Sequence, residues 1–163
     1  MPPHLLPETL ADHLDRLYRA ARALCDSRED AEDLVQETYA RVLSKRRVIG
    51  SDSDALPYLL SVLRNTFVSS LRTRSRRPQT APLEEAEPRL AAPASASPTA
   101  ALTAREVLAA IAALPGHQRD VVAAVDVAGL SYAEAADSLG VPAGTVMSRL
   151  HRGRARVALR WAA

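Results

Sequence analysis

The chain has 163 residues, of which 47% are hydrophobic and 4% aromatic, and its formal net charge of +2 identifies no binding partner by itself. This length allows one domain or two small ones. The single cysteine, Cys25, excludes an internal disulfide and a cysteine-based zinc site. No apolar run reaches the ~18 residues of a membrane span, and the N-terminus lacks the pattern of a signal peptide. We therefore expect a cytoplasmic protein without membrane insertion.

Apolar residues recur at helical spacing and strand patterns are scarce, which predicts an all-α protein. Five prolines between residues 78 and 100 remove backbone donors and prevent a continuous helix there. We therefore expect a flexible linker over 78–100. It would join an N-terminal helical domain, 1–77, to a C-terminal helical domain, 101–163.

In the N-terminal domain the spacing predicts a first helix from about residue 7 to residue 24. A second helix is expected to begin after Ser27, because Ser27 and Asp30 resemble a capping box. A polar loop that starts at Gly50 ends this unit. A third helix is predicted from about residue 54 to residue 76, and it has one apolar face.

In the C-terminal domain we expect helices over 103–114 and 117–127. Ser131 and Glu134 form a second capping-box pattern, which predicts a short helix that begins after Ser131. Gly140 is a favoured left-handed terminator for that helix. A longer helix is then expected from about residue 142 to residue 160.

A short helix, a glycine turn and a longer helix are the parts of a helix-turn-helix. The longer helix would expose hydroxyls and guanidiniums, which suit phosphates and base edges. The candidate DNA-binding residues on it are Thr145, Ser148, Arg149, Arg152 and Arg154. The alternative is a helical hairpin whose basic face is merely solvated.

The C-terminal half carries a series of short motifs at Leu114-Pro115, 119–122, 129–134, 139–142 and 144–150. Together they resemble region 4 of the extracytoplasmic-function (ECF) sigma factors. This resemblance implies that the domain reads the −35 promoter element, with Ser131 and Tyr132 added to the DNA-binding set, and docks on the flap of the polymerase β subunit. Met147 stands where the family commonly has Lys or Arg. Gly153 stands where Ala is usual, which is expected to loosen the helix by ~1 kcal/mol.

The segment 30–39 resembles the region 2 helix with which the same family binds the clamp helices of the polymerase β′ subunit. Acidic residues beside an apolar one offer charge complementarity and apolar contact to a coiled coil. The alternative is an ordinary amphipathic helix whose acidic first turn is favoured by the helix dipole. The candidate polymerase-binding residues are Asp30, Asp33, Leu34, Gln36, Glu37 and Arg41.

The helix over 56–77 resembles the family's segment that reads the −10 element, although Ser69 stands where Asp is common. Its polar and basic residues face away from the apolar stripe, and the basic ones at its end suit phosphates. The loop 49–54 takes the place where the family captures a flipped base. The candidate −10 residues are Ser51, Asp52, Ser53, Arg64, Asn65, Arg72 and Arg76.

The combined resemblance implies an ECF sigma factor that binds core RNA polymerase and promoter DNA, with an anti-sigma factor as a further partner. Its work is recognition and strand capture, so we expect no catalytic residue, metal or cofactor. One rival is a dimeric helix-turn-helix repressor or response-regulator output domain, which binds palindromic DNA without polymerase. A second rival is a helical adaptor that has no DNA role.

Overall fold

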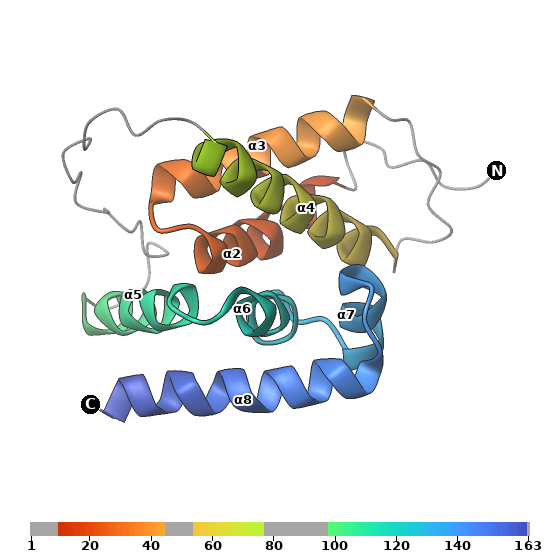
Figure 1. Cartoon of the computed structure of the whole chain (residues 1–163). Helices are drawn as coiled ribbons and strands as arrows, with labels where there is room; N and C mark the ends of the chain where they lie inside the picture. The colour runs from red at the N-terminus through yellow and green to blue at the C-terminus, as the bar shows by residue number, and fades with distance from the viewer. Residues whose placement is uncertain (1–9, 45–53, 77–97, 163) are drawn as a thin grey trace.

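A computed structural model describes residues 10–44, 54–76 and 98–162, and every regular element in these ranges is helical. The helices form two layers, with α2 to α4 above and α5 to α8 below (Figure 1). The predicted all-α class is therefore confirmed for this part of the chain.

The upper layer consists of α2 (Leu14–Leu24), α3 (Arg28–Ser44) and α4 (Ala55–Arg76). Each of these helices buries one apolar stripe against the other two. Burial of such stripes, rather than intrinsic helix propensity, supplies most of the stability of short helices. Phe67 and Cys25 belong to this core, so the phenyl ring is not available as a wedge for DNA bases.

Ser27 caps α3 as the sequence predicts, but the Asp30 carboxylate does not make the reciprocal contact of a capping box. Ser27 Oγ accepts a hydrogen bond from the Asp30 backbone N–H at 3.0 Å. The Asp30 carboxylate does not reach back to the Ser27 N–H. It accepts instead from Ser27 Oγ at 2.9 Å and from Arg74 on α4 at 2.6 Å. The start of α3 is thereby tied to the end of α4.

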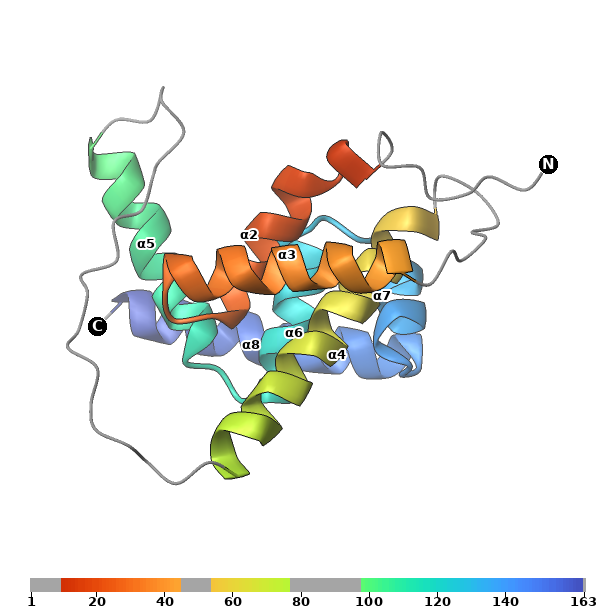
Figure 2. The same ribbon diagram turned by 90° about the horizontal axis from the view of Figure 1, so that it is seen from above.

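The lower layer consists of α5 (Pro98–Ala112), α6 (Gly116–Val122), the π-helical turn η2 (Ala123–Val127), α7 (Tyr132–Leu139) and α8 (Ala143–Ala162). Helix α5 begins at Pro98, inside the segment predicted as linker. Proline is favoured in the first turn of a helix because its missing N–H has no helical partner there. The helix expected over 117–127 is α6 followed directly by η2. Viewed from above, α6 lies beneath the upper layer (Figure 2).

The two layers share one continuous apolar core rather than forming separate bodies. Buried residues of α2 and α4 cluster with those of α6, η2 and α7. Polar contacts add to this core at its edge. Arg64 Nε on α4 lies 2.7 Å from Asp120 Oδ2 on α6, and the Arg119 guanidinium lies 5.0 Å from the centre of the Phe67 ring.

A third polar contact across the boundary comes from Arg16 on α2. Its Nε donates to the Ala128 carbonyl at 2.7 Å, and its Nη2 donates to the Gly129 carbonyl at 3.1 Å. These carbonyls follow η2, where the chain turns at Gly129 with φ of 77°. One arginine of the upper layer thus satisfies two acceptors of the lower layer.

Gly153 does not simply loosen α8, which corrects the expectation from the sequence. It is buried where α8 crosses α6, and a Cβ at this position would lie 2.7 Å from Val122 Cγ2. The missing side chain therefore allows the two helices to approach closely. This contact offsets the unfavourable helix propensity of glycine.

We expect Gly153→Ala to destabilise the protein. The methyl group gains about 1 kcal/mol of helix propensity, but overpacking a close contact costs about 1–3 kcal/mol. The free energy of unfolding should therefore fall by up to about 2 kcal/mol. Urea unfolding monitored by circular dichroism measures it.

The matched control is Gly153→Ala combined with Val122→Ala, which removes the clashing methyl. The double variant should be more stable than the sum of the two single effects, because residues in contact are coupled. A Gly153→Ala protein more stable than the wild type would show that the contact between α6 and α8 does not limit the size of residue 153.

Candidate functional site

The helix-turn-helix is built by α7 and α8. Ser131 Oγ accepts from the Glu134 N–H at 3.2 Å, and Glu134 Oε2 accepts from the Ser131 N–H at 2.7 Å. These bonds hold the pKa of the Glu134 carboxyl below its ordinary value, because they stabilise the charged form. Gly140 ends α7 with φ of 65°. The predicted capping box and glycine turn are both confirmed.

Small and apolar side chains hold α7 and α8 together. Ala135, Val146 and Leu150 are buried at the crossing, and Leu139 and Val141 pack against it. These side chains form the apolar wedge between the two helices. It leaves the opposite face of α8 exposed to solvent at its N-terminal half.

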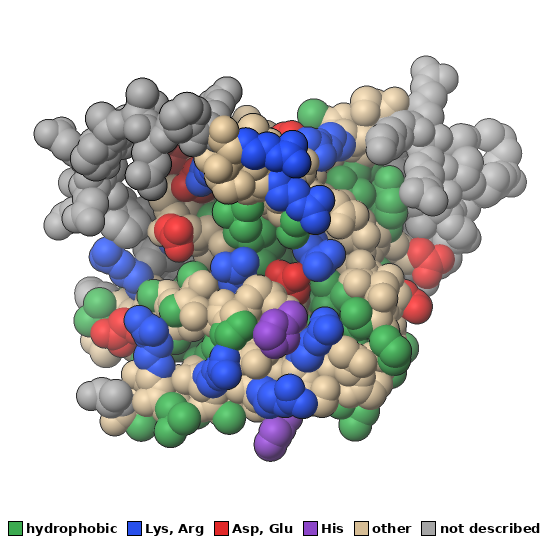
Figure 3. Space-filling view, viewed as in Figure 1, with side chains coloured by type: hydrophobic (Ala, Val, Ile, Leu, Met, Phe, Trp, Pro, Cys, Tyr) green, Lys and Arg blue, Asp and Glu red, His purple; other side chains and the backbone are tan. Residues whose placement is uncertain are grey.

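The exposed face of α8 carries most of the predicted −35 contacts. Ser148 and Arg152 are exposed, and Thr145 and Arg149 are half-buried. Ser131 and Tyr132 are exposed at the start of α7. Basic side chains are spread over the face of the molecule that includes α8 (Figure 3).

Arg154 is placed differently from the other predicted −35 residues. Its Nη2 and Nε lie 2.6 and 3.0 Å from the two carboxylate oxygens of Asp126 in η2. These hydrogen bonds raise the pKa of Arg154 because they stabilise the guanidinium. In this arrangement Arg154 links α8 to η2 and does not point freely toward a DNA backbone.

The predicted −10 residues of α4 divide into two groups. Arg64 pairs with Asp120 across the boundary between the layers. Asn65, Arg72 and Arg76 are exposed, and neither of these arginines has an ion-pair partner among the described residues. The remaining candidates, Ser51, Asp52 and Ser53, lie outside the described residues.

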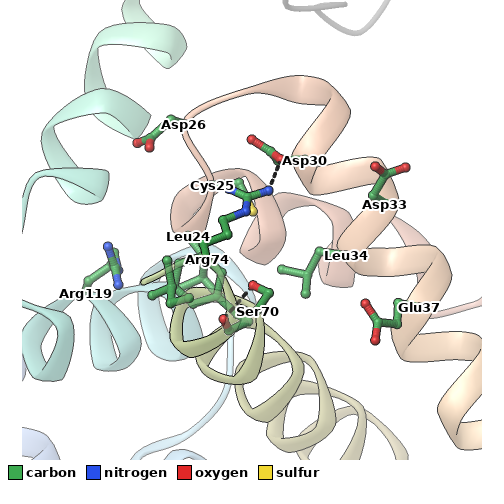
Figure 4. Close-up of a pocket in the computed structure, with 12 residues that line it drawn as sticks. Leu24, Cys25, Asp26, Asp30, Asp33, Leu34, Glu37, Ser70, Arg74 and Arg119 are labelled. Atoms are coloured by element: carbon green, nitrogen blue, oxygen red, sulfur yellow. Dashed lines mark hydrogen bonds and ion pairs between the residues drawn. The ribbon is translucent and has the colours of Figure 1, made fainter. Parts of the chain in front are cut away.

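A groove of about 280 Å³ lies between α3, α4 and the turn that follows α2. We call it the acidic groove, because Asp26, Asp30, Asp33 and Glu37 line it. Figure 4 shows these carboxylates along one side, with Leu34 between them and Arg119 facing from α6. Its apolar lining is formed by Leu24, Leu34, Phe67 and Leu71.

Four of the six predicted polymerase-binding residues line the acidic groove, namely Asp30, Asp33, Leu34 and Glu37. Arg41 pairs with Glu37 at 2.6 Å, next to the groove. Gln36 lies on another face of α3, in a second groove between α2 and α3.

Sequence reasoning did not place Arg119 in the acidic groove, because its approach depends on the packing of the two layers.

Within the described side chains, no group of His, Cys, Asp and Glu is arranged to hold a metal ion. None of the helices in 10–44, 54–76 and 98–162 is both long and apolar enough to cross a bilayer.

Comparisons with known proteins agree on both halves of the chain. The family model for sigma-70 region 2 matches residues 10–77, and that for sigma-70 region 4 matches residues 104–157. The chain is 39% identical over 150 residues to ECF RNA polymerase sigma factor SigM of Mycobacterium tuberculosis, covering 90% of this chain and 71% of SigM. It is 38% identical over 152 residues to SigE of Mycolicibacterium smegmatis, covering 90% of this chain but only 58% of SigE.

Solved structures show the same fold. The sigma factor RpoE of Bartonella quintana, in complex with the anti-sigma factor NepR, matches with a TM-score of 0.74 and 25% identity over 95% of both chains. CnrH, in complex with the cytosolic domain of CnrY, matches with a TM-score of 0.68 and 22% identity over 93% of this chain and 84% of CnrH.

The fold and the capped helix-turn-helix define a DNA-binding transcription protein. More narrowly, the chain belongs to the ECF RNA polymerase sigma factors of the sigma-70 family. Its function is that of a sigma factor, promoter recognition in transcription initiation.

The pairing of Asp30 with Arg74 makes the stability of the upper layer depend on pH. Partial burial acts to raise the pKa of Asp30, but hydrogen bonds from Arg74 and Ser27 outweigh it and leave the pKa below its ordinary value. The stabilisation is therefore complete above the unfolded-state pKa of about 3.9, and it is lost as pH falls through the lower folded-state pKa.

We expect Asp30→Asn to lower the free energy of unfolding at pH 7 by less than about 1 kcal/mol, because solvent screens this half-exposed pair. The difference from the wild type should shrink as the pH falls below about 4. Urea unfolding across this pH range measures it, with the exposed neighbour Glu29→Gln as control. If the difference in unfolding free energy between Asp30→Asn and the wild type did not change with pH, the pair of Asp30 and Arg74 would not be the source of the pH dependence.

Proposed function

We propose that this sigma factor binds core RNA polymerase through the acidic groove, reads the −10 element with α4 and reads the −35 element with α7 and α8. The observation that carries the proposal is the capped helix-turn-helix with its exposed hydroxyl and guanidinium face, in the half that matches sigma-70 region 4. The acidic groove lies in the half that matches region 2.

For the −35 element, α8 is the reading helix. It has 20 residues, so it is about 30 Å long and can enter the major groove at its N-terminal end. Arg149 and Arg152 suit bidentate contacts to guanine or contacts to phosphate. Thr145 and Ser148 lie on the same exposed stretch and suit phosphate or base edges. Ser131 and Tyr132 would contact the backbone from α7.

For the −10 element, the exposed residues of α4 face away from the core. Asn65 can hydrogen-bond a base edge, and Arg72 and Arg76 can neutralise phosphates. Ser51, Asp52 and Ser53, which precede α4 in the sequence and lie outside the described residues, complete this proposed site. Binding of exposed bases by this half would favour the open promoter by differential affinity.

For core polymerase, the acidic groove suits a helical partner that has apolar and basic side chains, such as the β′ clamp helices. Its carboxylates and its apolar lining offer both kinds of contact. A candidate surface for the β flap lies in the lower layer, on α5 and the C-terminal end of α8. There Leu102 of α5 and Leu159 and Trp161 of α8 are exposed, and exposed apolar residues of this kind favour protein contacts.

In the structure the two layers are packed together, which we call the closed arrangement. For this function they must separate into an open arrangement. The labels −10 and −35 differ by about 25 base pairs, or roughly 80 Å of duplex, whereas α4 and α7 are in direct contact here. Both elements therefore cannot be bound together in the closed arrangement. Because RpoE matches over 95% of its length in a complex with NepR, we propose an anti-sigma factor as the partner that favours the closed arrangement.

Arg149→Ala with Arg152→Ala should reduce promoter-specific transcription with purified core polymerase. Each lost base contact costs about 1–3 kcal/mol, which corresponds to a loss of roughly fivefold to more than a hundredfold. Each lost phosphate contact should lower the salt slope of binding by about 1. Arg19→Ala, on the exposed face of α2, is the control.

The same assay separates the rival functions. A repressor would bind the promoter tightly without polymerase, and a helical adaptor would keep its activity in the arginine variant. Either result would overturn the proposed function. We expect weak DNA binding by the free chain and tight binding by its complex with core polymerase.

Asp120→Asn should shift the chain toward the open arrangement, because it removes the partner of Arg64. A loss of about 1–2 kcal/mol would raise the ratio of open to closed forms about 5- to 30-fold. Small-angle scattering should then give a larger radius of gyration. The control is Asp126→Asn, which breaks an ion pair within the lower layer only. Equal scattering from all three proteins would show that Asp120 does not hold the layers together.

A further inference from the structure

Met147 is a large apolar side chain that remains exposed on α8. In this helix, which the structure describes in full, three large apolar side chains are exposed, and Met147 alone lies in the N-terminal half. Its exposed fraction is 54%, whereas the neighbouring Val146 is fully buried. Transfer of apolar surface out of water is favourable. A partner that brings an apolar group to this half of α8 would therefore gain affinity from Met147.

The packing of α8 fixes the direction in which Met147 points. Val146, Leu150 and Gly153 form the buried stripe of the helix. Successive residues of an α-helix lie about 100° apart around its axis, so Met147 is roughly a quarter turn away from this stripe. His151, one turn further along, lies on the same flank and is also exposed. A molecule bound along the N-terminal half of α8 therefore meets Met147 without any rotation of the helix.

The polar neighbours of Met147 do not read apolar groups. Ser148 Oγ donates its hydrogen to the Thr145 carbonyl at 3.1 Å, which leaves the hydroxyl oxygen as an acceptor. The guanidiniums of Arg149 and Arg152 suit guanine and phosphate. The C5-methyl group of thymine is the apolar mark of an A·T pair in the major groove, and it is recognised by apolar contact. Thr145 also has a methyl group, but this residue is half-buried.

We propose that Met147 is a specificity-determining residue that contacts the C5-methyl group of one thymine in the −35 element. This inference rests on the proposed function, because it requires that the N-terminal end of α8 enters the major groove. The position would then select an A·T pair whose methyl group faces α8. The methionine side chain is flexible and polarizable, so it can adapt to the methyl group while Arg149 and Arg152 hold the duplex.

The test removes the methyl group from the DNA by replacing thymine with uracil. The holoenzyme of this chain and core polymerase first selects its −35 element from duplexes randomised over that stretch. Each thymine of the selected element is then replaced singly by deoxyuridine, and the affinity of the wild-type holoenzyme is measured at one salt concentration. Loss of one buried methyl group should weaken binding of one of these duplexes by roughly threefold to fivefold.

Met147→Ala should bind that duplex equally well with thymine or uracil, because its short side chain does not reach the methyl group. Met147→Leu keeps a large apolar side chain and should retain the preference for thymine. The matched control is Thr145→Ser, which removes the other methyl group near the start of α8 and should discriminate as the wild type does. Thermal unfolding checks that all three variants fold as the wild type does.

The outcomes separate this inference from the proposed function. If Arg149→Ala with Arg152→Ala does not weaken binding to the selected duplex, α8 does not read the −35 element and both proposals fail. If that variant does weaken binding, the inference alone is wrong in three cases: no uracil replacement matters, its effect persists in Met147→Ala, or the effect is lost in Thr145→Ser instead.

Discussion

The packing of α2 and α4 against α6, η2 and α7 is the contact on which the rest of the structure depends. It joins the buried residues of both layers into one apolar core, and apolar burial is the main favourable term in folding. The same packing brings Arg119 into the acidic groove and holds Arg64 beside Asp120. Every candidate surface is therefore affected by whether the two layers are together or apart.

In the proposed function, the activity of the chain therefore depends on the relative stability of two forms, the closed one with the layers together and the open one with the layers apart. Promoter binding in the proposed function needs the layers apart, whereas the apolar core and the polar contacts at its edge keep them together. A partner changes such an equilibrium only through its different affinity for the two forms. In the proposed function, polymerase and promoter DNA would favour the open form, and an anti-sigma factor would favour the closed one. Both effects act on the same boundary.

The sequence predicted the features that arise from neighbouring residues. The capping box of Ser131 and Glu134 and the turn at Gly140 depend on spacings of a few residues, and both are present. Pairs distant in sequence were not predictable in this way. Arg64 and Asp120 are 56 residues apart, and Arg154 and Asp126 are 28 apart, so their pairing follows only from tertiary packing. The role of Gly153 likewise required the position of Val122 on another helix.

The two carbonyl groups after η2 have a consequence for how the layers separate. Within the closed form Arg16 supplies the donors for both acceptors, and the contact to Gly129 is exposed to solvent. When the layers part, water can take the place of that arginine at once, so neither oxygen is left without a donor. At this edge the boundary between the layers therefore resembles a reversible protein–protein contact, with solvent exchange rather than bond loss.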